Sequence, residues 1–269
     1  MAGIAGAVVA GIAFMLGNGA PIAGVAVNLA SLCLGLAVTW IGIRLTPRPS
    51  LALPAIVAIA LALLATAFFG NDTDGVRRWI RIGPIAIHIA MLTCPALVIL
   101  YARSAPSLAR VFAMAIGAIA IALQPDRGAA LALFAAALTV AAMRRTAADI
   151  LLAFITLIGL AVTLTRPDTL NPVAFVEHVL ADGWAVSPIW GLVLTAGATL
   201  LLLPLTAFAN VPNGIRAALA GWMAWTIGLL AASLLGDYPT PVIGIGASAI
   251  VGHSLALALL CNTIGRRSA

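Results

Sequence analysis

Three arginines lie within five residues of one another: Arg77, Arg78 and Arg81. Planar guanidinium groups match the oxygens of a phosphate in bidentate geometry. The cluster therefore predicts a binding site for a phosphate-bearing ligand. The alternative is an ordinary loop in which these arginines form ion pairs with the nearby carboxylates of Asp72 and Asp74.

A second candidate is the segment Gln124-Pro125-Asp126-Arg127-Gly128, which separates two short apolar runs. A carboxylate near membrane depth is costly unless it is paired or faces a wet cavity. We therefore expect Asp126 to line a polar cavity, or to cap the following helix at its N-terminus and pair with Arg127. The two roles are compatible with each other.

The third candidate is the longest polar stretch of the chain, which contains Glu177, His178 and Asp182. Carboxylates and imidazoles can be tuned toward neutral pH, so these side chains are candidates for a general acid or base. The alternative is a solvated amphipathic segment. His88 and His253 show no metal-ligand spacing and are expected to be hydrogen-bonded interior residues. No metal site and no cofactor is expected.

The composition determines which elements must position these residues. The chain has 269 residues, of which 63% are hydrophobic and 8% are charged, and its mean hydropathy is +1.16. Soluble domains carry roughly 25% charge, so most of this chain must lie in a bilayer. Its apolar runs are helix-length, at roughly 15 to 22 residues, and do not alternate with period two. They predict an all-α, polytopic membrane bundle of about ten transmembrane helices, forming a single domain over residues 1–269.

The apolar runs also give approximate boundaries for these helices. Two short ones that meet at Pro125, near residues 109–123 and 128–143, are expected to sit inside the bundle, because a short helix cannot easily span a bilayer alone. The expected helices lie near residues 2–16, 22–43, 51–69, 84–102, 109–123, 128–143, 149–164, 189–208, 215–235 and 241–262.

The distribution of charge predicts the orientation. All 14 basic residues are arginines. Nine of them, with one acid, lie in the loops after the even-numbered helices and in the C-terminal tail, while five lie with seven acids in the loops after the odd-numbered helices. By the positive-inside rule the arginine-rich side is cytoplasmic, which places both termini inside. The scattered arginines thus determine topology and do not indicate binding to nucleic acid, and the candidate chemistry lies on the outer face.

Three stretches, in this order, resemble motifs of the SEDS family, which includes RodA, FtsW and SpoVE. Residues 75–80 (GVRRWI) are similar to the family's GARRWI loop, and residues 123–130 (LQPDRGAA) are similar to its LQPDLGTA motif. Residues 241–248 (PVIGIGAS) are similar to its PFISYGGS motif. The ten-helix topology with both ends inside is also typical of the family.

The resemblance implies a protein of cell shape or division in the bacterial cytoplasmic membrane. The family polymerises lipid II into glycan strands at the outer face, so the implied partners are lipid II or a related polyprenyl-pyrophosphate lipid, membrane lipids and a class B penicillin-binding protein. Glu177 and Asp182 become the candidate catalytic bases. The implied substrate-binding residues are Arg77, Arg78, Arg81, Gln124, Asp126 and Ser248.

The chain also departs from the family pattern. Residues 88–91 (HIAM) stand where members have a Gln-Pro-Ser-Glu run, and Ala174 aligns with the family's catalytic aspartate. Two hypotheses follow: a divergent glycan polymerase that uses Glu177 or Asp182 as its base, and a non-catalytic SEDS-like protein that binds the lipid-linked precursor or a penicillin-binding protein. A flippase of lipid-linked precursors ranks third, because transporters place polar groups at the midplane whereas these charges lie in loops.

Overall fold

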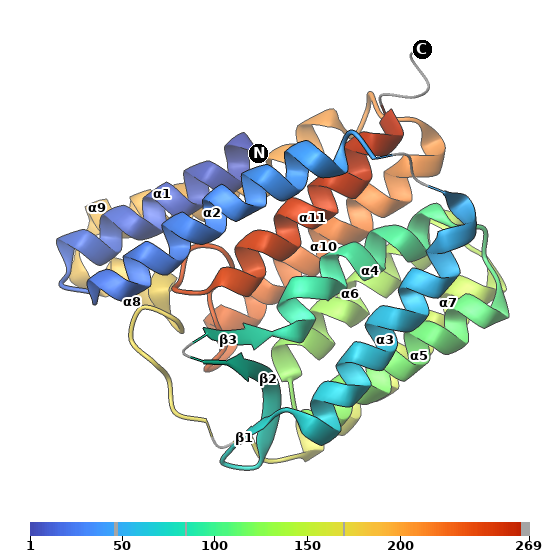
Figure 1. The fold of residues 1–269 in the computed structure, drawn as a ribbon, viewed down its shortest axis with the longest axis horizontal. Coiled ribbons are helices and arrows are strands. Elements are labelled where there is room, and N and C mark those ends of the chain that lie inside the picture. The colour runs from blue at the N-terminus through green and yellow to red at the C-terminus, as the bar shows by residue number, and fades with distance from the viewer. Residues whose placement is uncertain (46–47, 84, 169, 265–269) are drawn as a thin grey trace.

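The computed structural model describes residues 1–45, 48–83, 85–168 and 170–264, which form a helical bundle with a small sheet at one end (Figure 1). Short 3-10 helices, η1 (Pro49–Leu51) and η2 (Leu203–Ala207), precede α3 and follow α9. The α-helices of this described part are α1 (Ala2–Gly17), α2 (Ile22–Gly42), α3 (Ala52–Phe69), α4 (Ile89–Arg103), α5 (Leu108–Leu123), α6 (Arg127–Arg144), α7 (Ala147–Thr165), α8 (Val179–Val186), α9 (Pro188–Leu200), α10 (Asn213–Leu235) and α11 (Ala247–Ile264).

Most of these helices have the length and composition of membrane spans. Within the described residues, five are long and apolar enough to cross a bilayer: α2, α3 together with η1, α6, α7 and α10. Five more, α1, α4, α5, α9 and α11, are apolar but shorter. Only α8, with eight residues, falls outside both groups. The predicted all-α, polytopic membrane bundle is confirmed, and the protein is a multi-pass membrane protein.

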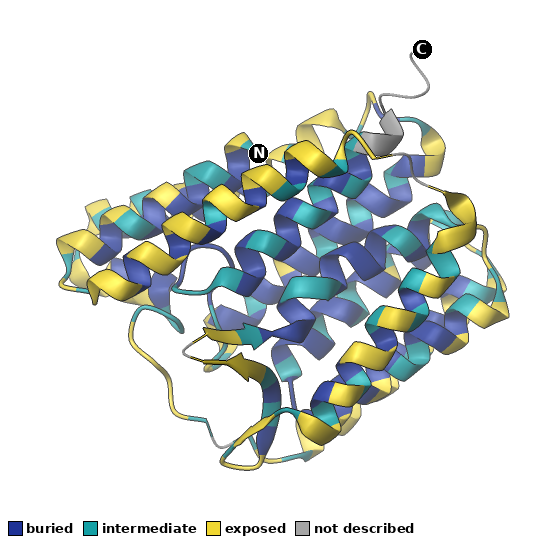
Figure 2. Ribbon diagram, viewed as in Figure 1, coloured by how far each residue is buried: buried dark blue, intermediate teal, exposed yellow. Residues whose placement is uncertain are grey.

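The interior of the bundle is formed mainly by α4 and α10, with α6 and α11 beside them (Figure 2). The expectation that the segments now seen as α5 and α6 fill the interior is right for α6 and wrong for α5. One side of α5 faces outward, with Phe112 65% and Ile119 54% exposed. The short helix that is truly enclosed is α4, whose 15 residues are mostly buried.

Close approach of α6 and α10 depends on small side chains. A Cβ atom added at Gly228 of α10 would lie 2.6 Å from the Cα atom of Ala132 in α6. Without a hydrophobic effect between helices in lipid, such close backbone packing supplies much of the association energy. The abundance of alanine and glycine in the chain is therefore used to bring these two helices together.

An antiparallel sheet of three strands, β1 (Asn71–Thr73), β2 (Val76–Ile82) and β3 (Ile85–His88), joins α3 to α4 in the order β1-β2-β3. The expected polar loop and the helix expected from near residue 84 are therefore wrong, since strands occupy this segment. Gly83 has a φ of 58° and turns the chain, after which Ile85 pairs with Ile82 across the strands. Helix α4 begins only at Ile89, because His88 is its N-cap and accepts a hydrogen bond from the amide of Met91 at 3.3 Å.

Two further boundaries differ from the expected ones for reasons of local chemistry. The helix expected over 189–208 ends at Leu200, and the chain continues through the 3-10 helix η2, which has Pro204 in its first turn. Proline removes a helical hydrogen bond and ends a regular ladder. The last helix begins at Ala247 instead of near residue 241, because residues 241–246 form turns. The polar stretch before α9 contains the extra helix α8.

Candidate functional site

The loops at the sheet end of the bundle meet around the side chain of Arg78. This residue lies on β2, and its side chain is only 2% exposed. Its Nε donates to the carbonyl of Gln124 at 3.4 Å, and its Nη2 donates to the carbonyl of Pro125. Nη2 also donates to Oδ2 of Asp168 at 2.6 Å. One guanidinium thus joins the sheet, the break between α5 and α6, and the loop after α7.

Tyr238, from the connection between α10 and α11, completes this group. Its hydroxyl donates to Oδ2 of Asp168 at 2.7 Å, and its ring centroid is 5.6 Å from the guanidinium carbon of Arg78. Burial, followed by the hydrogen bond to Asp168, raises the pKa of the Tyr238 hydroxyl far above its usual value. The hydroxyl therefore remains a donor, and the Asp168 carboxylate is held by two groups at once.

Asp126 connects the beginnings of three helices. Its side chain accepts from the amide of Ala129 at 2.9 Å, so it caps α6 as expected. The expected pairing with Arg127 is wrong: the second carboxylate oxygen, Oδ2, lies 3.3 Å from Nε2 of His88 at the start of α4. The amide of His88 in turn donates to Oγ of Ser248 at the start of α11. As expected, His88 is a hydrogen-bonded interior residue.

The Gln124 side chain also holds elements together. It is fully buried, and its Nε2 donates to the carbonyl of Leu63 in α3 at 2.7 Å. Its Oε1 has no hydrogen-bond partner among the residues that the structure describes. The residues expected to bind substrate therefore divide into a buried group, which contains Arg78, Gln124, Asp126 and Ser248, and an exposed pair.

That exposed pair is Arg77 and Arg81. Successive side chains of a strand point to opposite faces, so β2 separates these two from the buried Arg78. Arg77 forms an ion pair with Asp72 at 3.0 Å, with side chains 43% and 49% exposed. The alternative of pairing within the loop is therefore observed for Arg77, and the three arginines do not converge on one point.

The stretch after α7 folds back onto the connection between α10 and α11. The amide of Thr240 donates to the carbonyl of Val176 at 2.9 Å, and the amide of Ile245 donates to that of Phe175 at 2.7 Å. The ring of Phe175 also packs 5.9 Å from that of Phe14 in α1. This segment is thus anchored at several points and is not a free solvated loop.

The two expected catalytic acids lie in different places on this segment. The Glu177 side chain accepts from the amide of Val173 at 2.7 Å, within its own loop, and burial raises the pKa of Glu177. Asp182 is exposed in the first turn of α8. His178 makes a different contact, with its Nε2 at 2.5 Å from Oδ1 of Asp237.

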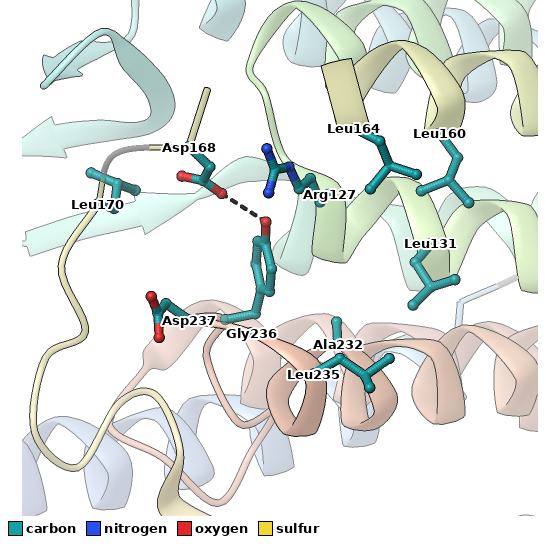
Figure 3. A pocket seen from close by; sticks show the side chains of 11 residues that line it. Arg127, Leu131, Leu160, Leu164, Asp168, Leu170, Ala232, Leu235, Gly236 and Asp237 are labelled. Atoms are coloured by element: carbon teal, nitrogen blue, oxygen red, sulfur yellow. Dashed lines mark hydrogen bonds between the residues drawn. The ribbon is translucent and has the colours of Figure 1, made fainter. Parts of the chain in front are cut away.

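A cavity of about 350 Å³ lies between α6, α7 and α10 (Figure 3). Leucines form its wall toward the bundle, and charged or hydroxyl groups lie at its other end (Figure 3). Leu164 and Leu235, which line it, are 59% and 82% exposed, so the cavity opens to the surface of the bundle. It is lined by Arg127, Leu131, Leu160, Leu164, Asp168, Leu170, Ala232, Leu235, Gly236, Asp237 and Tyr238.

Arg127 is the one cation among the described residues that line this cavity. Its Nη2 donates to the carbonyl of Arg166 at 2.7 Å, and its Nε donates to that of Thr163 at 3.4 Å. These bonds tie the beginning of α6 to the end of α7. They also place a positive charge where the apolar wall meets the polar end.

Three residues of this site were not among the predicted site residues: Asp168, which lies in the third candidate stretch, and Asp237 and Tyr238. A signal was present, since both acids belong to the arginine-poor side of the chain and Tyr238 is one of only two tyrosines. Nothing in their spacing predicted that they would meet, because Asp168 and Tyr238 are 70 residues apart. Within the described residues, no group of three or more His, Cys, Asp or Glu side chains is placed to hold a metal ion.

Comparison with models of known families finds no match, and comparison with curated proteins finds none either. Among solved structures, the chain is similar to the rod shape determining protein RodA of Thermus thermophilus, with a TM-score of 0.70 and 20% identity over 99% of this chain and 96% of that one. An aspartate-to-alanine variant of the same RodA gives a TM-score of 0.73 and 21% identity, with the same coverage.

A third solved structure, of a peptidoglycan synthase complex that coordinates polymerization and crosslinking, gives a TM-score of 0.66 and 21% identity over 98% of this chain and 96% of that one. All three likenesses extend over nearly the whole of both chains. The SEDS-like fold indicated by the three sequence motifs is confirmed, and this chain has the fold of RodA.

Proposed function

We propose that this chain is a divergent SEDS-like protein of the bacterial cytoplasmic membrane, acting as one domain in cell-wall synthesis. Its ligand is lipid II or a related polyprenyl-pyrophosphate lipid, taken up at the outer face, and its reaction is glycan polymerisation. The fold of RodA supports the general role. The cavity between α6, α7 and α10 is the observation that carries the choice of ligand.

The two ends of the cavity match the two parts of such a lipid. A prenyl chain fits the wall formed by Leu131, Leu160 and Leu164, and a pyrophosphate with its sugars fits the polar end near Arg127 and Asp168. A volume of about 350 Å³ is within the usual range for ligand pockets, about 300–1,000 Å³. Because the cavity opens to the surface of the bundle, a lipid can enter it sideways from the bilayer.

The buried group around Arg78 lies next to the polar end of the cavity and holds its lining residue Asp168 in place. Arg78 holds Asp168 and the α5–α6 break, while Asp126 and Ser248 hold the starts of α4, α6 and α11. We assign these residues, with Gln124, to positioning of the polar end. Arg127 then becomes the direct phosphate ligand, while Arg81, together with Arg77 in its ion pair with Asp72, attracts the headgroup from the exposed face of β2.

The chemistry of polymerisation explains the need for a cation. A hydroxyl of one sugar attacks the anomeric carbon of another, and the bond from that carbon to the pyrophosphate breaks. Negative charge develops on the departing pyrophosphate, and a fixed guanidinium stabilises it. The attacking hydroxyl loses its proton to a base.

Binding of labelled lipid II to the purified protein tests the ligand. Arg127→Gln should weaken binding at least about tenfold, since a hydrogen bond to a charged group contributes about 1.5–3 kcal/mol. Arg145→Gln is the matched control, because Arg145 is an exposed arginine at the opposite end of α6. Equal affinity in both variants would reject the cavity as the lipid site.

A second function is favoured by one observation. Within the described part of the chain, neither Glu177 nor Asp182 lines the cavity. A non-catalytic protein that holds the lipid-linked precursor, or a class B penicillin-binding protein, needs no base there. Polymerisation assays with and without such a partner separate the two functions: glycan product supports the polymerase, and lipid II binding without product supports the scaffold.

A further inference from the structure

Two carboxylates line the cavity, and they differ in accessibility. The side chain of Asp168 is 10% exposed, and one of its oxygens is shared between Arg78 and Tyr238. The side chain of Asp237 is 50% exposed. Its Oδ1 lies 2.5 Å from Nε2 of His178, while its other oxygen accepts no hydrogen bond in the described part of the chain. Asp237 is therefore the acid that a bound sugar can reach.

We propose that Asp237 is the general base of glycosyl transfer in this cavity, and that His178 is the residue that positions it. This inference rests on the proposed function, since it assigns a role within the same site. It replaces Glu177 and Asp182, whose side chains lie in their own loop and on α8.

The backbone around the pair is built to hold it in place. Glu177 and Pro239 form an antiparallel bridge, and the amide of Thr240 donates to the carbonyl of Val176. His178 has a φ of 58°, in the left-handed region that non-glycine residues seldom adopt. Such strain persists only where the surroundings enforce it, and it occurs most often at functional sites. The bridge thus fixes the imidazole beside Asp237.

The direction of the hydrogen bond between His178 and Asp237 follows from their chemistry. An ionised carboxylate only accepts hydrogen bonds, so Nε2 of His178 carries the proton and donates it to Oδ1 of Asp237. That bond occupies Oδ1 and leaves Oδ2 without a hydrogen bond in the described part of the chain, so this oxygen can accept a proton from a sugar hydroxyl. The charged groups around the carboxylate are His178 and Glu177 from the loop, with Arg127 and Asp168 across the cavity.

The proposed step balances in protons and electrons. The acceptor hydroxyl of one lipid-linked sugar forms a bond to the anomeric carbon of the other, and its proton moves to Oδ2 of Asp237. The bond from that carbon to the pyrophosphate oxygen breaks, and its electron pair leaves with the polyprenyl pyrophosphate. Arg127 faces the leaving group. Release of the proton to water restores the carboxylate.

Lipid II polymerisation by the purified full chain tests the assignment. Asp237→Asn should lower kcat at least about 100-fold, because general-base catalysis contributes about 10²–10⁴-fold, and should still bind lipid II. Asp74→Asn is the matched control, since Asp74 is an acid on the same side of the chain, in the turn between β1 and β2. Its kcat should equal that of the unaltered protein.

His178 is tested by a graded pair. His178→Ala should lower kcat between about tenfold and 100-fold at unchanged KM, since a misplaced catalytic group costs that much. His178→Gln retains an N–H donor and should recover part of the loss. A purely structural role would instead raise KM and lower lipid binding in both variants.

The possible results of these assays separate the assignment of Asp237 as the base from the proposed polymerase function. Unchanged kcat in Asp237→Asn overturns the assignment of the base while leaving the polymerase intact. Loss of product in Glu177→Gln or Asp182→Asn alone would instead place the base in the loop or on α8. An unaltered protein that binds lipid II but makes no product, with or without its partner, overturns both the polymerase and the base.

Discussion

Arg78 and Asp168 are 90 residues apart in the chain, yet Nη2 of one and Oδ2 of the other meet at 2.6 Å, almost out of reach of solvent. Burying two charges is costly unless they are paired and hydrogen-bonded. Here the carbonyls of Gln124 and Pro125 and the Tyr238 hydroxyl provide the additional bonds. The pair is thus the centre of the network that shapes the polar end of the cavity.

Substituting Arg78 should therefore lower the free energy of unfolding far more than substituting its neighbour Arg77. Arg78→Gln leaves Asp168 buried without its cation, and we expect the free energy of unfolding to fall by about 3–5 kcal/mol. Arg77→Gln breaks an ion pair whose side chains are nearly half exposed, which is worth at most about 1 kcal/mol. Unfolding of both variants in detergent measures the difference, and equal losses would contradict the central role of Arg78.

The contact between α6 and α10 provides a second prediction. Gly228→Ala places a Cβ 2.6 Å from the Cα of Ala132, so we expect a loss of about 1–3 kcal/mol from overpacking. Gly214, in the same helix, has no atom within 4 Å of such a Cβ, and Gly214→Ala should be neutral or gain up to about 1 kcal/mol. Thermal unfolding tests both. The two helices also flank the cavity, so lipid II binding should fall in Gly228→Ala alone.

Asp126 has two separable roles. Asp126→Asn retains an oxygen that accepts from the amide of Ala129, whereas Asp126→Ala removes the cap of α6 altogether. Loss of a cap costs about 1 kcal/mol, so the alanine variant should be less stable than the asparagine variant by about that amount. If the two unfold alike, the cap does not contribute and the contact with His88 accounts for the whole effect.

The raised pKa of Glu177 predicts a pH dependence of stability. Burial disfavours the ionised carboxylate in the folded protein, and hydrogen bonds from backbone amides offset this only in part. The folded pKa thus lies above the ordinary value of 4.5, so the stability that the protonated group contributes is present below pH 4.5 and is lost as pH rises through the folded pKa. Glu177→Gln, whose side chain does not ionise, should remove this fall in stability with rising pH. Comparing unfolding midpoints below pH 4.5 and at neutral pH measures it, and identical pH profiles would argue against it.

Much of the fold could be predicted from the sequence, because a bilayer permits few alternatives. Helix-length apolar runs gave the spans, and the charge count on alternate loops predicted an orientation. The prediction was wrong for β3, which was expected to be part of a helix because Ile85 and Ile87 are compatible with either structure. The turn at Gly83 and the pairing with β2 make this segment a strand.

The site was less predictable. Arg78, Gln124 and Asp126 were predicted as site residues from the sequence. The burial of Arg78 and the exposure of Arg77 and Arg81 could not be predicted, because they depend on the alternation of side chains along a strand that was not expected. Asp237 and Tyr238 stayed unnoticed because no spacing rule connects them to the loop after α7. Their contacts with His178 and Asp168 cross 59 and 70 residues and exist only in the folded bundle.

The bonds from Arg78 to the carbonyls of Gln124 and Pro125 also complete the end of a helix. Gln124 is the C-cap of α5, so its carbonyl is among those that a helix leaves without a partner at its end. A guanidinium 46 residues earlier in the chain supplies that partner. The sheet between α3 and α4 therefore serves as a cap for α5, so that any change in β2 that displaces Arg78 also weakens the end of a helix that lies far from it in the sequence.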